Sequence, residues 1–485
     1  MRRAHAVVGA LAVAVAASAA AQDPQRLKQD ALDFVTLRSN ILPGVGARAF
    51  GMGGAFIARP DDGTAASWNP AGLSYLRLPE FSIVGAASSI DIVSSVNLTP
   101  SASGGAPRTM ITKNDRFSGQ TPDFISATHP VALVGASGAV QLSFQRVISF
   151  DGRHEITEFR PADPSTLRAF QQFGGFDVIA FGSGLQIARD VRVGFTVNRW
   201  FNGYNYKFER TGGNEPSNQT VDFTFKGWNT NLGVIWSPFE SLNLGAVYKS
   251  GFTATVDLRR SRVDTPASFP ATQNRFEVPN PGDPTRVPPT PAIPPVNLDF
   301  PATFGGGASW RPRTPLTISA DYTRTRWSRA RIRNYFTLPQ VGTPTFPEIN
   351  PVPEAPELEE DLFYELNYPT LLKSRSPQVD SHQVRLGVEY IVVRQRVKWP
   401  LRAGFFLDRQ LFQTLDETTG LRSQVPTYKG FTAGTGLIIG PVLLDVAYIH
   451  QWGNYRDGDL DSDLLEDNSV RSNRFLVSLI YRLKR

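Results

Sequence analysis

Few side chains in this sequence have the types and spacing that catalysis requires. The segment Gly135-Ala136-Ser137-Gly138-Ala139 carries a glycine-flanked serine, as in the nucleophile elbow of serine hydrolases, but alanine stands where the elbow needs its closing glycine. A hydrolase also needs a histidine beside that serine. The sequence places no histidine in a recognisable grouping with Ser137; the histidines considered are His129, His154, His382 and His450. It therefore predicts no catalytic residue and no enzyme.

A second group of candidate residues is acidic. Asp459, Asp461 and Asp463 have the opening spacing of a calcium-binding loop. Leu464 stands where such a loop needs its sharp glycine turn, and no glutamate closes it at the right distance. A solvated acidic loop is the simpler interpretation, so neither a metal site nor a cofactor is expected.

The first 21 residues have the organisation of a secretory signal peptide. Arg2 and Arg3 precede an apolar stretch of alanine, valine and leucine, and a run of small residues ends at Ala21. Cleavage there would leave a mature chain that begins at Gln22. No later segment reaches the roughly 18 uninterrupted apolar residues of a membrane-spanning helix. The chain has no cysteine, which rules out a small disulfide scaffold.

The formal net charge is +6, a modest excess for 485 residues. In an exported protein this excess does not favour nucleic-acid binding. Exposed Arg and Lys side chains fit an anionic lipid surface better. Outer-membrane lipid and lipopolysaccharide are therefore the expected macromolecular surroundings, and no nucleic acid is expected as a partner.

From about residue 80 to the C-terminus, short runs alternate apolar and polar residues, which is typical of antiparallel strands. In one run, Leu242, Leu244 and Ala246 interleave with Asn243 and Gly245. About 14 such strands are expected. A soluble sandwich and a membrane barrel would both show this alternation, so it does not choose between them.

The connections between these runs favour the membrane barrel over the soluble sandwich, because they alternate between short and long. The short ones are 188–190, 237–241, 311–315, 394–398 and 440–441. The long ones are 211–219, 261–297, 335–379, 412–426 and 457–469. Short periplasmic turns, long extracellular loops and aromatic residues near the strand ends are typical of outer-membrane proteins. The predicted fold is all-β, a transmembrane antiparallel β-barrel over residues 79–485.

If the apolar residues of each strand face lipid, the polar ones face the lumen. The charged residues expected there are Asp321, Arg385, Glu389, Arg402, Asp408 and Asp445. They could anchor the carboxylate headgroup of a ligand or hold an internal plug by ion pairs. Structural pairing is the commoner role of such residues.

Residues 44–76 are expected to form neither a long helix nor a regular strand, because they contain several glycines, two prolines and an Asp-Asp-Gly turn signal. This segment, with its Asn69-Pro70-Ala71 triplet, resembles the start of the FadL/TodX family of outer-membrane transporters for long-chain fatty acids and aromatic hydrocarbons. Later pieces also resemble that family, at 227–252, 298–310, 327–328, 400–410 and 443–452.

The resemblance implies a hatch, or plug, formed by residues 22–78 inside a barrel of 14 strands, and a sideways exit for apolar substrates at a kinked strand. The residues that it places in the hatch or on the substrate pathway are Phe50, Met52, Phe56, Asn69, Pro70 and Ala71. The triplet is expected beside the kink.

The resulting hypothesis is a monomeric outer-membrane transporter for passive uptake of hydrophobic small molecules, either long-chain fatty acids or aromatic hydrocarbons. Two alternatives remain open: an accessory barrel of a protein secretion system, and a general porin. The acidic run at 354–365 mixes carboxylates with leucine and aromatic residues. It could fold over the barrel mouth as a capture site or form a mobile surface loop.

Overall fold

The computed structural model describes residues 43–98, 109–133, 136–149, 152–160, 163–211, 217–264, 275–278, 296–333, 379–394, 397–411, 413–415, 422–459 and 464–483. Three sequence-based predictions lie outside these residues: the signal peptide at 1–21, the first part of the hatch at 22–42, and the capture loop at 354–365. Among the described residues, no helix is long and apolar enough to cross a membrane.

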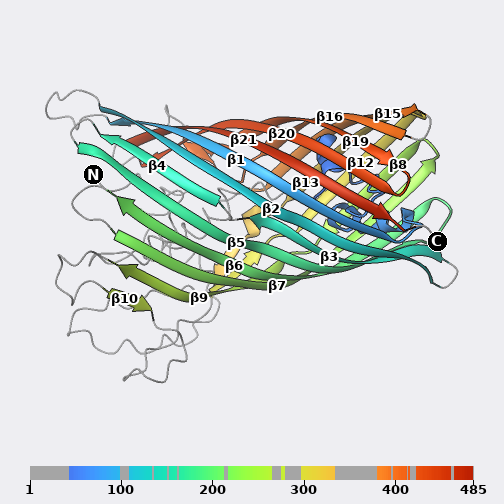
Figure 1. The fold of residues 1–485 in the computed structure, drawn as a ribbon, viewed down its shortest axis with the longest axis horizontal. Coiled ribbons are helices and arrows are strands. Elements are labelled where there is room, and N and C mark those ends of the chain that lie inside the picture. The colour runs from blue at the N-terminus through green and yellow to red at the C-terminus, as the bar shows by residue number, and fades with distance from the viewer. Residues whose placement is uncertain are drawn as a thin grey trace, which may run out of the picture.

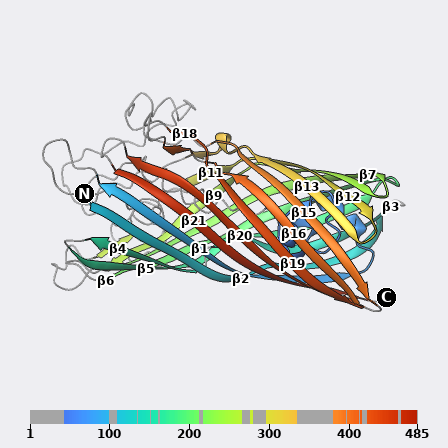
Figure 2. The same ribbon diagram turned by 90° about the horizontal axis from the view of Figure 1, so that it is seen from above.

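Most of the described chain is β-strand, and the strands form one closed antiparallel barrel (Figures 1 and 2). Its strands are β1 (Glu80–Leu98), β2 (Thr109–Leu133), β3 (Ala136–Ser149), β4 (Gly152–Arg160), β5 (Asp163–Gln186), β6 (Val191–Thr211), β7 (Ser217–Phe239), β8 (Leu242–Lys249), β9 (Phe252–Asp264), β10 (Arg275–Val278), β11 (Val296–Phe300), β12 (Thr303–Arg313), β13 (Leu316–Thr325), β14 (Arg331–Arg333), β15 (Ser381–Arg394), β16 (Val397–Arg409), β19 (Thr427–Ile439), β20 (Val442–Asp459) and β21 (Leu464–Arg482). A separate short pair is β17 (Thr414–Leu415) and β18 (Arg422–Gln424).

The wall counts as 14 strands, because several of its strands are interrupted. β4 continues β3, β9 continues β8, β10 and β11 lead into β12, and β14 continues β13. The first and last strands then close the barrel: β1 pairs with β21 from Glu80 opposite Arg482 to Leu98 opposite Leu464. The predicted all-β barrel of about 14 strands is confirmed.

The two faces of the wall differ sharply in polarity. Along β15, Val384, Leu386 and Val388 are 40–49% exposed on the outside. Arg385 and Glu389, which occupy alternate positions of the same strand, are almost completely buried inside. The same alternation recurs on the other strands. A continuous band of exposed large apolar side chains is stable only against hydrocarbon, so this wall spans a lipid bilayer.

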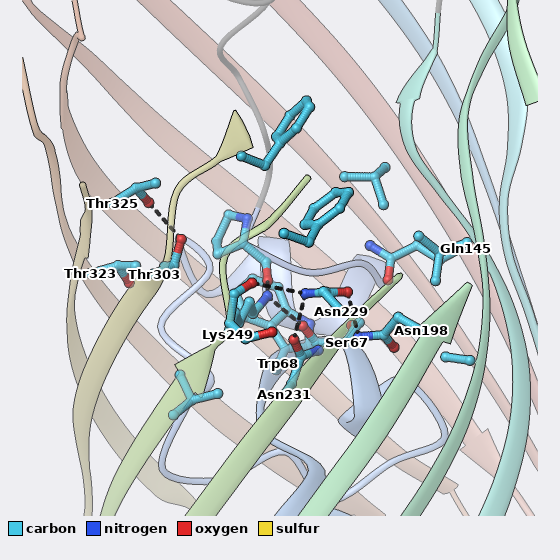
Figure 3. Close-up of a pocket in the computed structure, with 18 of the residues that line it drawn as sticks. Ser67, Trp68, Gln145, Asn198, Asn229, Asn231, Lys249, Thr303, Thr323 and Thr325 are labelled. Carbon is cyan, nitrogen blue, oxygen red and sulfur yellow. Dashed lines mark hydrogen bonds between the residues drawn. The ribbon is translucent and has the colours of Figure 1, made fainter. Parts of the chain in front are cut away.

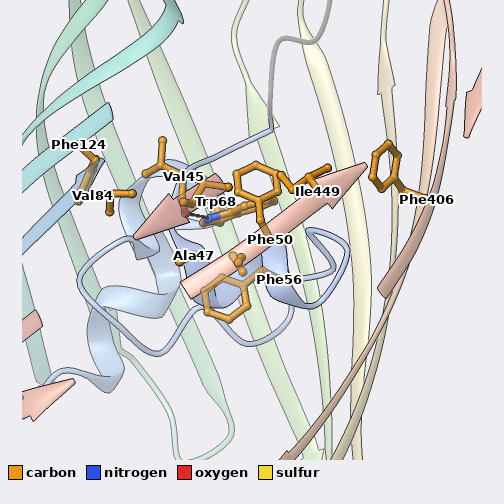
Figure 4. Close-up of a cluster of buried hydrophobic side chains, with 12 residues drawn as sticks. Val45, Ala47, Phe50, Phe56, Trp68, Val84, Phe124, Phe406 and Ile449 are labelled. Carbon is orange, nitrogen blue, oxygen red and sulfur yellow. Dashed lines mark hydrogen bonds between the residues drawn. The ribbon is translucent and has the colours of Figure 1, made fainter. Parts of the chain in front are cut away.

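Residues 43–79, here called the N-terminal segment, lie inside the barrel near the end that carries the C-terminus (Figure 1). The segment contains two short helices, α3 (Ala47–Gly51) and α4 (Ala65–Trp68), and the 3-10 helix η1 (Pro70–Tyr75). Its centre is Trp68, whose Nε1 donates to the carbonyl oxygen of Val45 at 2.7 Å. Figure 4 shows this indole among apolar side chains of the segment and of the wall.

Several strands are interrupted at the level just above the N-terminal segment. β8 and β9 are separated by residues 250–251, β11 and β12 by 301–302, and β13 and β14 by 326–330, which include the 3-10 helix η2 (Trp327–Arg329).

The ladder between β2 and β3 is also interrupted. It runs from Leu133 opposite Ala136 to Phe124 opposite Gln145, and pairing resumes only at Ser118 opposite Arg153 in β4. In the part of the chain that the structure describes, residues 119–122 of β2 therefore pair with β1 alone among the strands, and Asp123 lies at a bulge in that ladder.

The facing of the strands can be tested by placing a charge on the outer surface. Val446 is 39% exposed and lies four residues after the start of β20, near the middle of the apolar band. Val446→Arg should lower the free energy of unfolding by about 2–4 kcal/mol, because arginine at the bilayer midplane is poorly solvated. Refolding into lipid vesicles measures this change.

Thr427→Arg is the matched control, because Thr427 also faces outward but stands at the far end of β19 from the short turn. Near the interface the same substitution should cost about 0–1 kcal/mol. An equal cost at both positions would contradict the assigned depth.

Candidate functional site

A pocket lies inside the barrel directly above the N-terminal segment (Figure 3). Its floor includes Ile57, Ser67 and Trp68 of the segment, and its walls come from β3, β5 to β9, β11 to β13 and β15. The pocket therefore lies between the N-terminal segment and the inner face of the wall.

The upper part of the pocket is aromatic. Trp200 stacks on Phe252 with ring centroids 5.0 Å apart, and Phe252 stacks on Phe300 at 5.1 Å. Phe225 and Trp327 each contact Phe300 edge-on, at 5.6 and 6.2 Å. Rings in these arrangements form a rigid apolar surface that suits a flat or flexible hydrocarbon.

The strand interruptions bring these rings together. Phe252 follows Gly251, Phe300 precedes Pro301, and Trp327 lies in η2, so each ring belongs to a point where the regular strand ends or begins. Gly227 on the neighbouring strand has no side chain, and a Cβ there would stand 2.6 Å from the ring of Phe252. The breaks and this glycine let the rings turn into the lumen.

The lower part of the pocket is polar and contains one ammonium group. Lys249 Nζ donates to the carbonyl oxygens of Pro43 at 2.5 Å and Ser67 at 3.0 Å. Beside it, Asn198 Nδ2 and Trp200 Nε1 both donate to Oδ1 of Asn229, at 3.0 and 2.7 Å. Two carbonyl oxygens leave part of the ammonium's hydrogen-bonding capacity available to an anionic headgroup.

The lumenal charged residues predicted from sequence all face inward and are buried. Arg402 joins two of the others, since its Nε donates to Glu389 at 2.8 Å and its Nη1 donates to Asp445 at 2.6 Å. Arg48 of the N-terminal segment donates to the same Glu389 at 3.3 Å. These residues hold the segment rather than line the pocket.

The remaining predicted residues act in the same way. Arg385 pairs with Asp408 at 3.1 Å and donates to the carbonyl oxygen of Gly53 at 3.0 Å. Oδ2 of Asp321 accepts hydrogen bonds from the backbone amides of Phe56 and Ile57, at 2.6 and 2.7 Å. The wall thus satisfies main-chain groups of a segment that has little regular structure of its own.

Charge balance inside the segment follows the same pattern. Asp61 lies 2.6 Å from Arg48 and 3.3 Å from Arg59. Burial alone would raise the pKa of the Asp61 carboxyl, but the two guanidinium groups outweigh it and lower that pKa to about 2. The carboxylate is therefore charged at neutral pH and helps to neutralise the two arginines.

The predicted hatch residues divide into two groups. Phe50, Met52 and Phe56 are buried within the segment, where Phe50 and Phe56 meet the Trp68 ring edge-on. They form the core of the segment and are absent from the lining of the pocket described above. Their predicted place on a substrate pathway stays a proposal.

The triplet contacts the wall directly. Asn69 Nδ2 donates to the carbonyl oxygens of Val234 in β7 at 3.1 Å and Ala246 in β8 at 3.3 Å. Pro70 and Ala71 lie against Gly194 of β6, where a Cβ would overlap both residues. Pro70 also lies against Gly184 of β5, the strand that pairs with β3. The structure thus places the triplet at β5 to β8, and its position beside a kinked strand stays a prediction.

Glycines make this close fit possible around much of the barrel. On the inner face of the wall they stand where a Cβ would meet atoms of the N-terminal segment: Gly184, Gly194, Gly233, Gly245, Gly387, Gly404 and Gly434. The main chain of the segment can therefore approach the main chain of the strands.

Sequence reasoning missed the residues that line the pocket. The residue patterns assign no role in binding to Lys249, Trp200, Phe252 or Phe300. The available signal was the position of Gly251 and Pro301 next to two of the aromatic residues, because these two residue types interrupt strands. Among the described residues, no group of three or more His, Cys, Asp or Glu could hold a metal ion.

The comparisons with known proteins concern the fold. No protein-family model matches the chain, and no curated protein sequence matches it. Among solved structures, a Pseudomonas aeruginosa FadL homologue superposes with a TM-score of 0.54 and 12% sequence identity, over 91% of this chain and 99% of that one. The P. putida toluene transporter TodX superposes with a TM-score of 0.50 and 12% identity, over 92% and 100%.

The chain therefore has a closed antiparallel barrel fold, and within that class the fold of the FadL and TodX proteins. The resemblance inferred from residues 44–76 and the later pieces is confirmed at the level of the fold.

The fit between segment and wall can be tested at Gly194. In Gly194→Ala the added methyl group would overlap Pro70 and Ala71, so the segment must shift. Overpacking of this kind costs about 1–3 kcal/mol, and denaturant unfolding in lipid vesicles measures it. Gly306→Ala is the control: Gly306 faces outward, and the nearest atom to its Cβ is 3.9 Å away. Equal stability of the two variants would show that the segment does not press against β6.

Proposed function

We propose that this protein is a monomeric outer-membrane transporter that takes up hydrophobic small molecules by diffusion, without covalent chemistry. The lumenal pocket carries the proposal. Its upper surface is built from stacked aromatic rings, and Lys249 is the one charged side chain among the lining residues that the structure describes. An apolar solute gains free energy by leaving water for such a surface.

The two ends of the pocket favour an amphipathic ligand with a carboxylate. A headgroup beside Lys249 and Asn229 would have hydrogen-bond donors, and a hydrocarbon tail would lie against Phe252 and Phe300. Long-chain fatty acids have this form, and aromatic hydrocarbons would use the ring surface alone. Both substrate classes named from the sequence fit, and the ammonium group favours the first.

The N-terminal segment supports the proposal of a hatch over residues 22–78. Its described part is bonded to strands on several sides of the lumen, through Ser478 of β21, Thr432 of β19 and Gln141 of β3. A lumen filled in this way does not favour a general porin, which needs a water-filled channel. Asn69 fits the role of an anchor that fixes the hatch to β7 and β8.

A sideways exit through the wall is part of the proposal. The interrupted ladder between β2 and β3 favours an exit at that point of the wall. Residues 119–123 lack a strand partner on this side among the described residues. The pocket reaches the same place, because Gln145, Val147 and Ile148 of β3 line it. A ligand leaving here would pass into the lipid phase and avoid the N-terminal segment.

Filling the pocket tests the site. Ala180 is buried and lines the pocket, so Ala180→Trp should abolish binding of a long-chain fatty acid to the purified barrel and reduce its uptake at least tenfold. Phe181→Trp is the matched control, because Phe181 follows Ala180 directly on β5 but faces outward and is 48% exposed. Uptake retained in Ala180→Trp would remove the pocket from the pathway. Steady ion conductance in both variants would instead support a porin.

The exit can be located by photo-crosslinking. A photoreactive amino acid replaces Gln120, which faces outward beside the interrupted ladder, and an alkyne-tagged fatty acid is supplied from outside. We expect a crosslink that disappears when Ala180→Trp is also present. The same probe at Val384, on an intact ladder, reports fatty acid that is merely dissolved in the bilayer. Equal labelling at the two positions, insensitive to Ala180→Trp, would rule out this exit.

A further inference from the structure

The outer surface of the wall has a hollow of its own, on the side of β7, β8, β12 and β13. Ala246 and Gly306 form its floor, and Leu232, Tyr248 and Phe304 stand at its sides. The rings of Tyr248 and Phe304 are 5.0 Å apart. Small floor residues between large side chains leave an apolar groove that faces lipid.

Two arginines stand at one end of this hollow. Arg324 donates to Oδ2 of Asp380 at 2.5 Å, so its charge is largely neutralised. Arg326 also lines the hollow, and its side chain has no ion pair within the part of the chain that the structure describes. The hollow thus joins an apolar groove to an uncompensated guanidinium group.

The position of the arginines along the wall fixes their depth in the bilayer. Arg324 lies eight residues after Leu316, which follows a short turn. At about 3.3 Å per residue and a tilt of about 40°, eight residues climb roughly 20 Å, close to the far edge of an apolar band about 25 Å tall. The groove therefore lies in one leaflet, and the arginines lie at its headgroup level.

Other basic side chains face outward at a similar distance from the short turns. This basic belt consists of Arg199, Lys226, Arg409, Lys429 and Arg471, which lie 8 to 13 residues from the turn-side ends of their strands. A belt of this kind matches a headgroup layer with several negative charges per lipid.

We propose that the hollow binds one acyl chain of a phosphate-bearing glycolipid of the outer leaflet, of the lipid A type, and that Arg326 holds its phosphate. The groove has the apolar lining that an acyl chain requires, and a guanidinium group can bind phosphate oxygens in a bidentate manner. Lipid A carries several acyl chains and two phosphates, so one chain and one phosphate can occupy the hollow together. The inference is independent of transport, because the hollow lies outside the lumen.

The test uses the full-length barrel purified in detergent and titrated with diphosphoryl lipid A, with bound lipid counted by native mass spectrometry. Gly306→Phe fills the groove without meeting the wall, because the nearest atom to its Cβ is 3.9 Å away. Arg326→Gln removes the guanidinium group and keeps the backbone bond from Arg326 to Ala302. We expect each variant to weaken binding of the first lipid A molecule at least tenfold.

Arg471→Gln is the matched control, since Arg471 is an exposed member of the basic belt and does not line the hollow. It should bind the first lipid as the unmodified protein does. Phosphatidylglycerol supplies a different source of phosphate and should bind more weakly than lipid A. Unchanged lipid A binding in both Gly306→Phe and Arg326→Gln, or tighter binding of phosphatidylglycerol, would overturn the proposal.

Discussion

Hydrocarbon offers no hydrogen bonds, so every main-chain polar group of a wall in a bilayer must be bonded within the protein. At the seam between the first and last strands, the pairing of β1 with β21 over their whole length meets this requirement, because it leaves no open edge there. Strand alternation then has only one arrangement, with the apolar residues outside and the polar residues inside. The lumen, its charges and its pocket all follow from that closure.

A closed barrel with a polar interior needs something to satisfy its inward-facing charges. The N-terminal segment does so with only short helices of four to six residues. Arg402 and Glu389 meet Arg48 of the segment, and Asp321 binds two of its backbone amides. Glycines on the strands bring the two main chains close enough for these contacts. Segment and wall are therefore one packed unit, and the pocket is the space left above them.

Much of this arrangement could be predicted from the sequence, because it depends on period and composition. The alternation in β15 predicted that Arg385 and Glu389 face inward, and the connection lengths predicted the barrel. The pocket could not be predicted, because Phe252, Phe300 and Trp200 come from strands whose interruptions decide where the rings point. A contact of Asn69 with the wall was expected, but the strands that it meets could not be predicted, since an amide side chain can donate to any backbone carbonyl.

The strands differ greatly in length around the barrel. β2, β5 and β7 have 25, 24 and 23 residues, whereas β12 and β13 have 11 and 10. A tilted strand needs only about 9–11 residues to cross the hydrocarbon. One side of the wall therefore rises far beyond the bilayer, as its projecting end in Figures 1 and 2 shows. In an outer membrane, that tall side would stand within the hydrated carbohydrate layer. An apolar molecule on its inner surface would then be shielded from that layer by the protein.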